Sequence, residues 1–366
     1  MAVRRLIISD LHFGSGDALL AAPAGLERIE PELAWADELV INGDLFELVF
    51  TSLPDAVVAA RPFLALANRH VRRVHYLPGN HDHHLVSLAG DERRFAEVLG
   101  RPAPALFEVA PAERLLRSLC PDADVVCAYP VCELDGLRIT HGHYIAPHVG
   151  GSEWRLMDRL AWRLTGEVAR PDRLTVADYE GLIAPLYELM YEIANLPSGK
   201  RAQQQFERWL SGIAAIARAP QRASRQLTGL AQAIAGRAGS RELAPTEAPA
   251  DEVLQAMQVV CHNLEIAPGT VLFGHTHLPL DGVSTPDGAY RLYNSGSWVW
   301  DRRLREAASY RDCAWPGTVL RATGGDVELR SLLADCDEND LRTLLGVPVE
   351  PPPRRRGRPQ LVAVKR

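Results

Sequence analysis

The first part of the chain alternates short apolar runs with segments of helical character. Leu6–Ile8 and Leu39–Ile41 are apolar runs, Val71–Leu77 is a third strand-like run, and each is followed by a polar loop. Between the second and third runs, Pro54–His70 begins with proline and is rich in alanine and leucine, which favours a helix. Buried strands separated by crossover helices predict a βαβ architecture, in which functional loops lie at the carboxyl ends of the strands.

More strands are predicted around residues 125–140 and in the last third of the chain. Val125–Val131 and Leu137–Thr140 flank the turn-like Glu133–Gly136, which predicts a hairpin. Paired turn residues, such as Asp287-Gly288, separate the later apolar runs. These later runs are predicted strands: Thr270–Phe273, Leu280–Val283, Tyr290–Tyr293, Thr318–Ala322 and Asp326–Leu329.

Apolar side chains recur at helical spacing in the middle of the chain, where glycine and strand patterns thin out. This change predicts a helical insertion at residues 151–250 within an α/β unit. The main domain is accordingly expected to be discontinuous, at residues 1–150 and 260–335. Residues 350–366 are rich in proline and arginine and are expected to form a basic, disordered tail.

Composition narrows the class of protein. Hydrophobic residues make up 47% and charged residues 23%, which is ordinary for a globular chain with a sizeable core. The net charge of −6 gives no reason to expect nucleic acid as a partner, and the six cysteines form no CxxC pair. The apolar run before Ser9 is too short for a signal peptide, and no stretch approaches the ~20 apolar residues of a membrane span. The expected location is therefore the cytoplasm.

Five short segments concentrate potential metal ligands, and each follows a predicted strand. They read SDLH (9–12), NGDLFE (42–47), PGNHD (78–82), THGHY (140–144) and GHTH (274–277). Glycine lies beside the ligand in four of them, which lets the backbone turn sharply and leaves space next to the ligand. Carboxylate, amide and imidazole groups without thiolates suit divalent ions such as Mn²⁺, Fe²⁺, Zn²⁺ or Mg²⁺, and they do not suggest structural zinc.

Taken in order, these blocks resemble the calcineurin-like metallophosphoesterase family, whose pattern is DxH, GD, GNH plus an acidic residue, a histidine beside glycine, and GHxH. The resemblance covers residues 1 to about 145 and 265–300. It implies an α/β fold, a four-layer sandwich of two β sheets flanked by helices, here with the helical insertion. It also implies a hydrolase in which a water shared by two metal ions attacks a phosphomonoester, phosphodiester or pyrophosphate bond.

The resemblance implies a role for each of eight residues. One metal ion would be held by Asp10, His12 and His277. The other would be held by Asn80, His141 and His275. Asp44 would bridge the two ions, and His81 would be a catalytic histidine near the scissile phosphate. The expected cofactors are two divalent ions, Mn²⁺ before Fe²⁺, Zn²⁺ or Mg²⁺, and the expected substrate is a phosphorylated small molecule or a lipid-linked phosphate.

Some residues beside these blocks have more than one interpretation. His143 competes with His141 as the ligand, and the family spacing favours His141. Asp82 is expected to orient a loop or His81 instead of binding a metal. His83 is either an ordinary loop residue or a substrate contact.

Alternative functions lie mostly within the same fold. The SDLHFG start and the NGDLFE block look somewhat like the UDP-diacylglucosamine hydrolases of lipid A synthesis, but His81 stands where that branch has an arginine. A nuclease or cyclic-nucleotide phosphodiesterase would need a basic groove, which the net charge does not support. A non-catalytic scaffold would lack several ligands, and none is missing here.

The insertion and the tail each leave a choice open. The insertion is either a cap that shapes substrate choice or a dimerisation or membrane-surface element, and the oligomeric state is not predicted. Arg356–Pro359 reads RGRP, which is similar to a minor-groove AT-hook. Because one copy is weak evidence, a solvated basic tail is the favoured interpretation.

Overall fold

A six-stranded sheet carries the first three ligand blocks. The fold is that of a computed structural model, which describes residues 2–86, 109–149, 174–195, 250–300 and 315–346. The strands of this sheet, in spatial order, are β11 (Asp326–Ser331), β10 (Thr318–Thr323), β1 (Arg4–Ile8), β2 (Glu38–Asn42), β3 (Arg73–Leu77) and β4 (Asp124–Cys127). Strands β1 to β4 are parallel, and β10 and β11 extend the sheet in antiparallel fashion beside β1.

A second, five-stranded sheet carries the last two ligand blocks. Its strands, in spatial order, are β5 (Val131–Leu134), β6 (Leu137–Thr140), β7 (Gly269–Phe273), β9 (Tyr290–Asn294) and β8 (Leu280–Ser284). The three central strands are parallel, and the two edge strands are antiparallel to their neighbours. The turns at Asp287-Gly288 and Gly324-Gly325 connect β8 to β9 and β10 to β11, as predicted.

The two sheets pack face to face, and successive strand residues enter different cores. Leu6 and Ile8 of β1 lie in the core under the helices, whereas Ile7 lies in the core between the sheets. Leu272 of β7 enters this middle core from the second sheet. Because both faces of β1, β2 and β7 are buried along most of their length, each of these strands contains a continuous apolar run instead of an alternating pattern.

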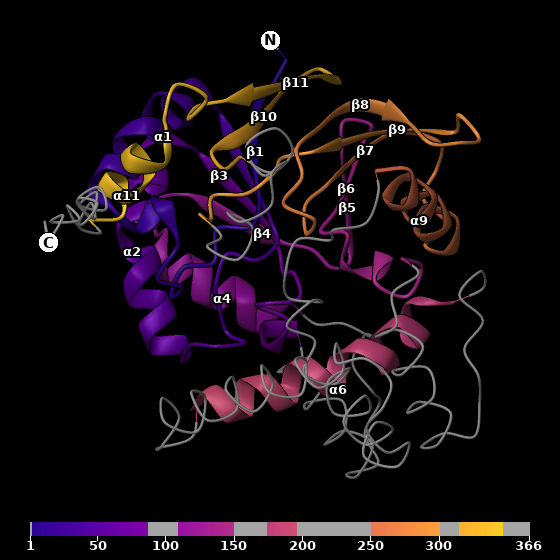
Figure 1. Cartoon of the computed structure of the whole chain (residues 1–366), viewed down its shortest axis with the longest axis horizontal. Coiled ribbons are helices and arrows are strands. Elements are labelled where there is room, and N and C mark those ends of the chain that lie inside the picture. The colour runs from indigo at the N-terminus through magenta and orange to yellow at the C-terminus, as the bar shows by residue number, and fades with distance from the viewer. Residues whose placement is uncertain (1, 87–108, 150–173, 196–249, 301–314, 347–366) are drawn as a thin grey trace, which may run out of the picture.

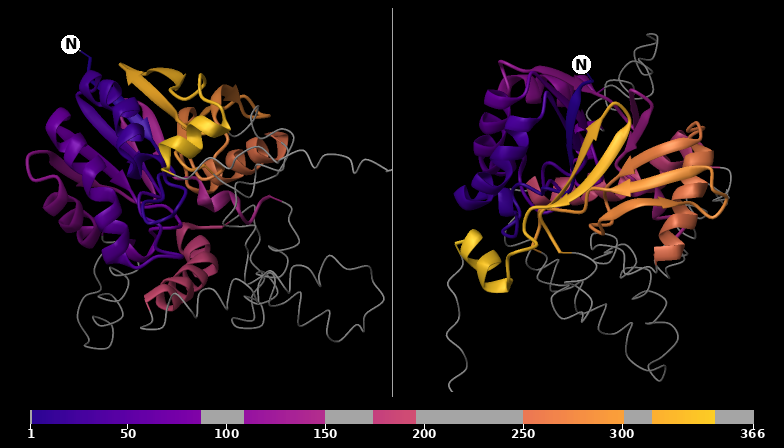
Figure 2. Two further views of the ribbon diagram at one scale, coloured as in Figure 1. Left: turned by 60° about the vertical axis from the view of Figure 1, so that its left-hand side comes forward. Right: turned by 90° about the horizontal axis from the view of Figure 1, so that it is seen from above.

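Helices cover the outer face of each sheet. Those packed on the first sheet are α1 (Pro23–Trp35), α2 (Leu53–His70) and α4 (Ala110–Leu119), with α11 (Glu338–Leu344) beside α1. On the second sheet, α9 (Ala250–Asn263) and the short η2 turn (His143–Ile145) share a core with β7 and β9. Figure 2 shows the resulting order of helices, sheet, sheet and helices. The predicted four-layer sandwich is confirmed.

One helix of the predicted insertion lies among the described residues. This helix, α6 (Val176–Asn195), begins with a reciprocal cap in which Thr175 and Asp178 bond each other's backbone amides at 2.8 and 3.3 Å. It runs along the lower side of the molecule, beneath both sheets (Figure 1). Most of the predicted insertion and all of the predicted tail, 350–366, lie outside the described residues. Across the described parts of the chain, no helix is long and apolar enough to span a membrane.

The predicted pairing of Val125–Val131 with Leu137–Thr140 is wrong in one respect. Strand β4 ends at Cys127 and lies parallel to β3 in the first sheet, so only the later β5 forms the hairpin with β6 in the second sheet. Pro130 lies between β4 and β5 and has no backbone N–H to donate to a ladder. The apolar run therefore divides at this point, and the chain passes from one sheet to the other.

The middle core yields a stability prediction. Ile7 is fully buried between the sheets, so Ile7→Ala should lower the free energy of unfolding by about 2–5 kcal/mol, measured by urea denaturation. Val58→Ala on α2 is the control, because Val58 is 65% exposed and its change should stay within about 0.5 kcal/mol. Equal effects of the two substitutions would contradict the face-to-face packing.

Candidate metal centre

The predicted ligands all lie where strands end, at the edge at which the two sheets meet. Each side chain sits one to four residues beyond its strand, and the carboxyl ends of parallel strands are where such sheets place their sites. The strands and their residues are β1 with Asp10 and His12, β2 with Asp44, β3 with Asn80, β6 with His141, and β7 with His275 and His277.

Hydrogen bonds from backbone amides join these loops within the first sheet and between the two sheets. The amides of Asp10 and His12 donate to the carbonyls of Gly43 at 3.1 Å and Asp44 at 2.9 Å. From the second sheet, the amide of His275 donates to both carboxylate oxygens of Asp10, each at 3.1 Å. The ligand positions are thus fixed by main-chain contacts as well as by their own side chains.

One group of converging side chains is Asp10, His12 and His277. One ligand atom from each lies within 4.8 Å of the others, and all three residues are buried. Nε2 of His277 is 3.3 Å from Oδ1 of Asp10 and 3.3 Å from Nε2 of His12. A carboxylate and two imidazoles at this spacing can hold a divalent ion.

A second group contains Asp44, His141 and His275, whose ligand atoms also converge within 4.8 Å. Asn80 adds an amide oxygen, with Oδ1 3.1 Å from Nε2 of His141 and 2.9 Å from Nδ1 of His275. Nδ2 of Asn80 is buried and has no hydrogen-bond partner among the described residues. The amide therefore turns its oxygen toward the ligand atoms, as a metal ligand would.

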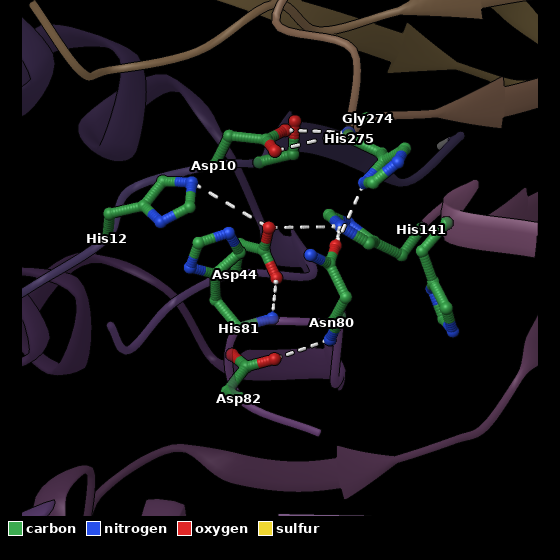
Figure 3. Close-up of polar contacts among 12 residues, drawn as sticks. Asp10, His12, Asp44, Asn80, His81, Asp82, His141, Gly274 and His275 are labelled. Atoms are coloured by element: carbon green, nitrogen blue, oxygen red, sulfur yellow. Dashed lines mark hydrogen bonds and ion pairs between the residues drawn. The ribbon is translucent and has the colours of Figure 1, made fainter. Parts of the chain in front are cut away.

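Asp44 lies between the two groups (Figure 3). Its Oδ2 is 3.2 Å from Nε2 of His141 in one group and 3.7 Å from Nε2 of His12 in the other. Its Oδ1 accepts a hydrogen bond of 2.8 Å from the amide of His81. A buried carboxylate that contacts both groups is the arrangement that two neighbouring cations require, because its charge offsets their repulsion.

The backbone at most of these ligands is left-handed. The φ angles are 55° at Asp10, 47° at His12, 53° at Asp44, 65° at His275 and 57° at His277. Residues other than glycine rarely adopt positive φ, at a cost of about 1–3 kcal/mol each, and such residues cluster at functional sites. Strain at five of the seven positions therefore marks this edge of the sheets as a functional site.

Three glycines make room for the ligands. A Cβ on Gly43 would lie 2.0 Å from Nδ1 of His141, and one on Gly79 would lie 2.3 Å from Oδ1 of Asp44. A Cβ on Gly274 would lie 2.7 Å from Oδ2 of Asp10. The glycines in the GD, GNH and GHxH blocks are therefore required by close packing against the ligand side chains.

Burial and opposite charges shift the pKa values of these side chains. Burial alone would raise the pKa of Asp44, but the nearby charges of His141 and His81 hold it well below its usual range. Burial alone would lower the pKa of His141, but the charge and hydrogen bond of Asp44 raise it to about 10. Burial and the charge of His141 lower the pKa of His275 to about 3. The buried carboxylates thus favour the protonated, positively charged form of a neighbouring imidazole. A bound divalent cation would supply that positive charge in place of the imidazole proton.

Glu47 is a site residue that the sequence did not single out. Its Oε2 is 3.0 Å from Nδ1 of His12, and its Oε1 is 2.8 Å from Nδ1 of His81. Burial would raise the pKa of Glu47, but the charge of His81 and the two hydrogen bonds lower it to about 2. One carboxylate therefore orients a predicted ligand and the predicted catalytic histidine. The sequence signal that could have identified Glu47 is its position three residues after Asp44 in the NGDLFE block.

Asp82 and His143 lie beside the two groups, not within them. Asp82 accepts hydrogen bonds from the amide of Leu45 at 2.8 Å and from the hydroxyl of Tyr76 at 2.6 Å, which ties the second loop to the third. His143 contacts Tyr129, with 3.1 Å between Nε2 and the hydroxyl. Its ring centroid is 5.5 Å from that of His141.

The Asn294–Ser297 turn holds the loops around the candidate centre together. In the Asn294–Ser297 turn, Nδ2 of Asn294 donates to the carbonyl of Gly274 at 2.8 Å, and Oγ of Ser295 is 2.7 Å from Oγ of Ser9. His75 lies away from the centre, 3.2 Å from Glu38.

Comparison with known proteins agrees with this geometry. The profile of the family described as calcineurin-like phosphoesterase matches residues 3–179. Those residues belong to the calcineurin-like phosphoesterase family. The match contains Asp10, His12, Asp44, Asn80 and His141, and it ends before the GHTH block. His275 and His277 lie outside the match, and the fold brings them to the same site because β7 lies beside β6 in the second sheet.

Curated protein sequences and solved structures were the other points of comparison. None of the curated proteins shows significant sequence similarity to this chain. The crystal structure of TT1561 of Thermus thermophilus is similar at 13% identity, over 91% of this chain and 100% of that one. The TM-score of the two structures is 0.33.

Glu47 gives a test of the site's outer contacts. Glu47→Gln should weaken Mn²⁺ binding by about 10–100-fold at the ion that His12 holds, because the histidine loses the carboxylate that orients it. Competition with a chelating dye should show one weakened and one unchanged site. Glu27→Gln, on an exposed position of α1, is the matched control. If both Mn²⁺ affinities equal those of the parent, Glu47 does not orient the ligand.

Proposed function

We propose that the chain is a phosphoesterase that works with two divalent metal ions. The observation that carries the proposal is Asp44, a single buried carboxylate in contact with both groups of ligands. Bound there, two ions would neutralise phosphoryl oxygens and increase the acidity of a water molecule. The donor set of carboxylate, amide and imidazole suits Mn²⁺, with Fe²⁺, Zn²⁺ and Mg²⁺ as alternatives.

His81 is the group proposed to act on the leaving oxygen. Its backbone amide is held by Asp44 at 2.8 Å, and its Nδ1 is held by Glu47 at 2.8 Å. With Nδ1 engaged, Nε2 is the nitrogen that can meet a substrate oxygen. The negative charge of Glu47 would stabilise the positive charge of the protonated His81 ring, whose Nε2 would give its proton to the leaving group. The ring lies edge-on to His12, with 4.4 Å between centroids, so a phosphate beside this ligand would also be beside His81.

The bond that is cleaved is proposed as a class. Phosphomonoesters, phosphodiesters and pyrophosphates all present the same charged oxygens to two cations. The natural substrate is proposed to be a phosphorylated small molecule or a lipid-linked phosphate. Manganese-loaded protein tested against nitrophenyl monoesters, nitrophenyl diesters, nucleotides and UDP-sugars would separate these substrates.

Metal content tests the proposal directly. Protein purified without chelator and reconstituted with Mn²⁺ should bind two ions per chain by elemental analysis. Asp44→Asn should lose both metal binding and hydrolysis, because the remaining ligands cannot offset the repulsion between two cations. Asp335→Asn is the control, since its side chain is 65% exposed and pairs with Arg28 far from the centre. A fully active Asp44→Asn variant, or reconstituted protein without metal, would refute the proposal.

The role of His81 yields a kinetic prediction. His81→Ala should keep both metal ions and lose about 10²-fold or more in kcat, the usual size of acid–base assistance. The loss should be smaller for esters with a good leaving group such as nitrophenolate, which needs little protonation. His70→Ala on α2, where the ring pairs with Glu30, is the control. An equal loss across leaving groups would show that His81 stabilises charge instead of donating a proton.

A further inference from the structure

Helix α6 of the insertion is attached to the catalytic loops by one carboxylate, Glu180. The side chain of Glu180 is 12% exposed, and its Oε2 is 2.7 Å from Nε2 of His83. Its Oε1 accepts hydrogen bonds from the hydroxyls of Tyr129 and Tyr144. Burial would raise the pKa of Glu180, but these partners lower it, so the carboxylate is held ionised.

Two of these partners, His83 and Tyr144, belong to loops that form the candidate centre, and Tyr129 lies between β4 and β5. His83 directly follows Asp82 of the PGNHD block, and its neighbour His84 stacks on Tyr191 of α6 with 3.4 Å between ring centroids. His83 also lies 5.6 Å from the ring of Tyr187 on the same helix. The helix therefore contacts the loop that carries the predicted catalytic histidine along several of its turns.

The hydrogen bonds around Tyr129 fix the direction of each proton. A carboxylate only accepts, so the single hydroxyl hydrogen of Tyr129 points to Glu180. The Tyr129 oxygen can then only accept from Nε2 of His143, 3.1 Å away. A neutral imidazole carries one N–H, so Nδ1 of His143 is left as an acceptor.

That acceptor lies beside the second group of ligands. The His143 ring is 5.5 Å from the ring of His141 and 6.4 Å from that of His275. His143 is buried, and its Nδ1 has no hydrogen-bond partner among the described residues. A buried acceptor without a partner costs free energy, which a hydrogen-bond donor of a bound substrate would recover.

We propose that Glu180 is a positioning residue through which the insertion shapes the substrate site. Its carboxylate clamps α6 to the loop of His83 and, through Tyr129, holds His143 with Nδ1 open to a hydrogen bond from the substrate. The substrate class that fits is a phosphoester whose alcohol part carries a hydroxyl or amino group near the phosphate. The clamp stands without the proposed function, whereas the role of His143 rests on it.

The clamp is tested by hydrogen exchange of the α6 amides, without metal or substrate. Glu180→Gln removes the charge that His83 and the tyrosines share, so exchange across residues 176–195 should become about ten-fold faster or more. Tyr129→Phe should accelerate it in the same direction. Ala177→Gln places the same side chain at an exposed position of the same helix and should change nothing. Unchanged exchange in both Glu180→Gln and Tyr129→Phe would overturn the clamp.

The role of His143 is tested by binding of two matched compounds. Glycerol 2-phosphate and isopropyl phosphate differ in two hydroxyls, and their Kd values can be measured by calorimetry on manganese-loaded His81→Ala protein, which turns over slowly. Glycerol 2-phosphate should bind about five-fold more tightly, as one hydrogen bond allows. Adding Tyr129→Phe or Glu180→Gln should bring the two Kd values within about two-fold of each other.

The possible failures are distinguishable. Equal Kd values for the two compounds in the His81→Ala protein would overturn the role of His143. A preference that survives both added substitutions would overturn the positioning by Glu180. If neither compound binds, the role of His143 fails, whereas metal content and hydrolysis by the parent protein still decide the proposed function and hydrogen exchange still decides the clamp.

Discussion

A single carboxylate, Asp44, contacts predicted ligands from two different sheets, and the packing of the sheets brings these side chains together. It follows β2 of the first sheet, yet its Oδ2 is 3.2 Å from His141 of the second sheet and 3.7 Å from His12 of its own. Such distances require the carboxyl ends of both sheets to meet at one edge. The middle core, with Ile7 and Leu272, fixes how closely the sheets approach. Packing that looks purely structural thus sets the geometry of the centre.

The centre is held together at the expense of local backbone stability. Left-handed conformations at Asp10, His12, Asp44, His275 and His277 each cost free energy that the surroundings must supply. Main-chain hydrogen bonds between the loops supply part of it, as do the glycines that admit the ligand side chains. Buried charge is compensated within the cluster as well, since imidazoles lie against each carboxylate. The same negative groups that need this compensation are the ones that would attract metal ions.

Much of the centre could be predicted from the sequence because ligands, glycines and strand ends coincide in short blocks. The apolar runs at Leu6–Ile8 and Leu39–Ile41 also placed β1 and β2 correctly. The features that the sequence did not reveal depend on contacts between distant segments of the chain. Apolar pattern alone could not show that the chain changes sheets at Pro130. Glu47 was missed because its role appears only when one loop places it against both His12 and His81. Helical periodicity indicated α6 but not that Glu180 faces the catalytic loops.

The order of the strands has a consequence for synthesis of the protein. Asp10 and His277 lie in contact but are separated by most of the chain, and β1 pairs on one side with β10, which is made later still. On the ribosome, β1 therefore emerges with one edge unpaired, and Asp10 emerges before its partners His275 and His277 have been made. Contacts between such distant segments slow folding and leave intermediates open to aggregation. The nascent chain can thus assemble the complete candidate centre only after β7 and the GHTH block have been made.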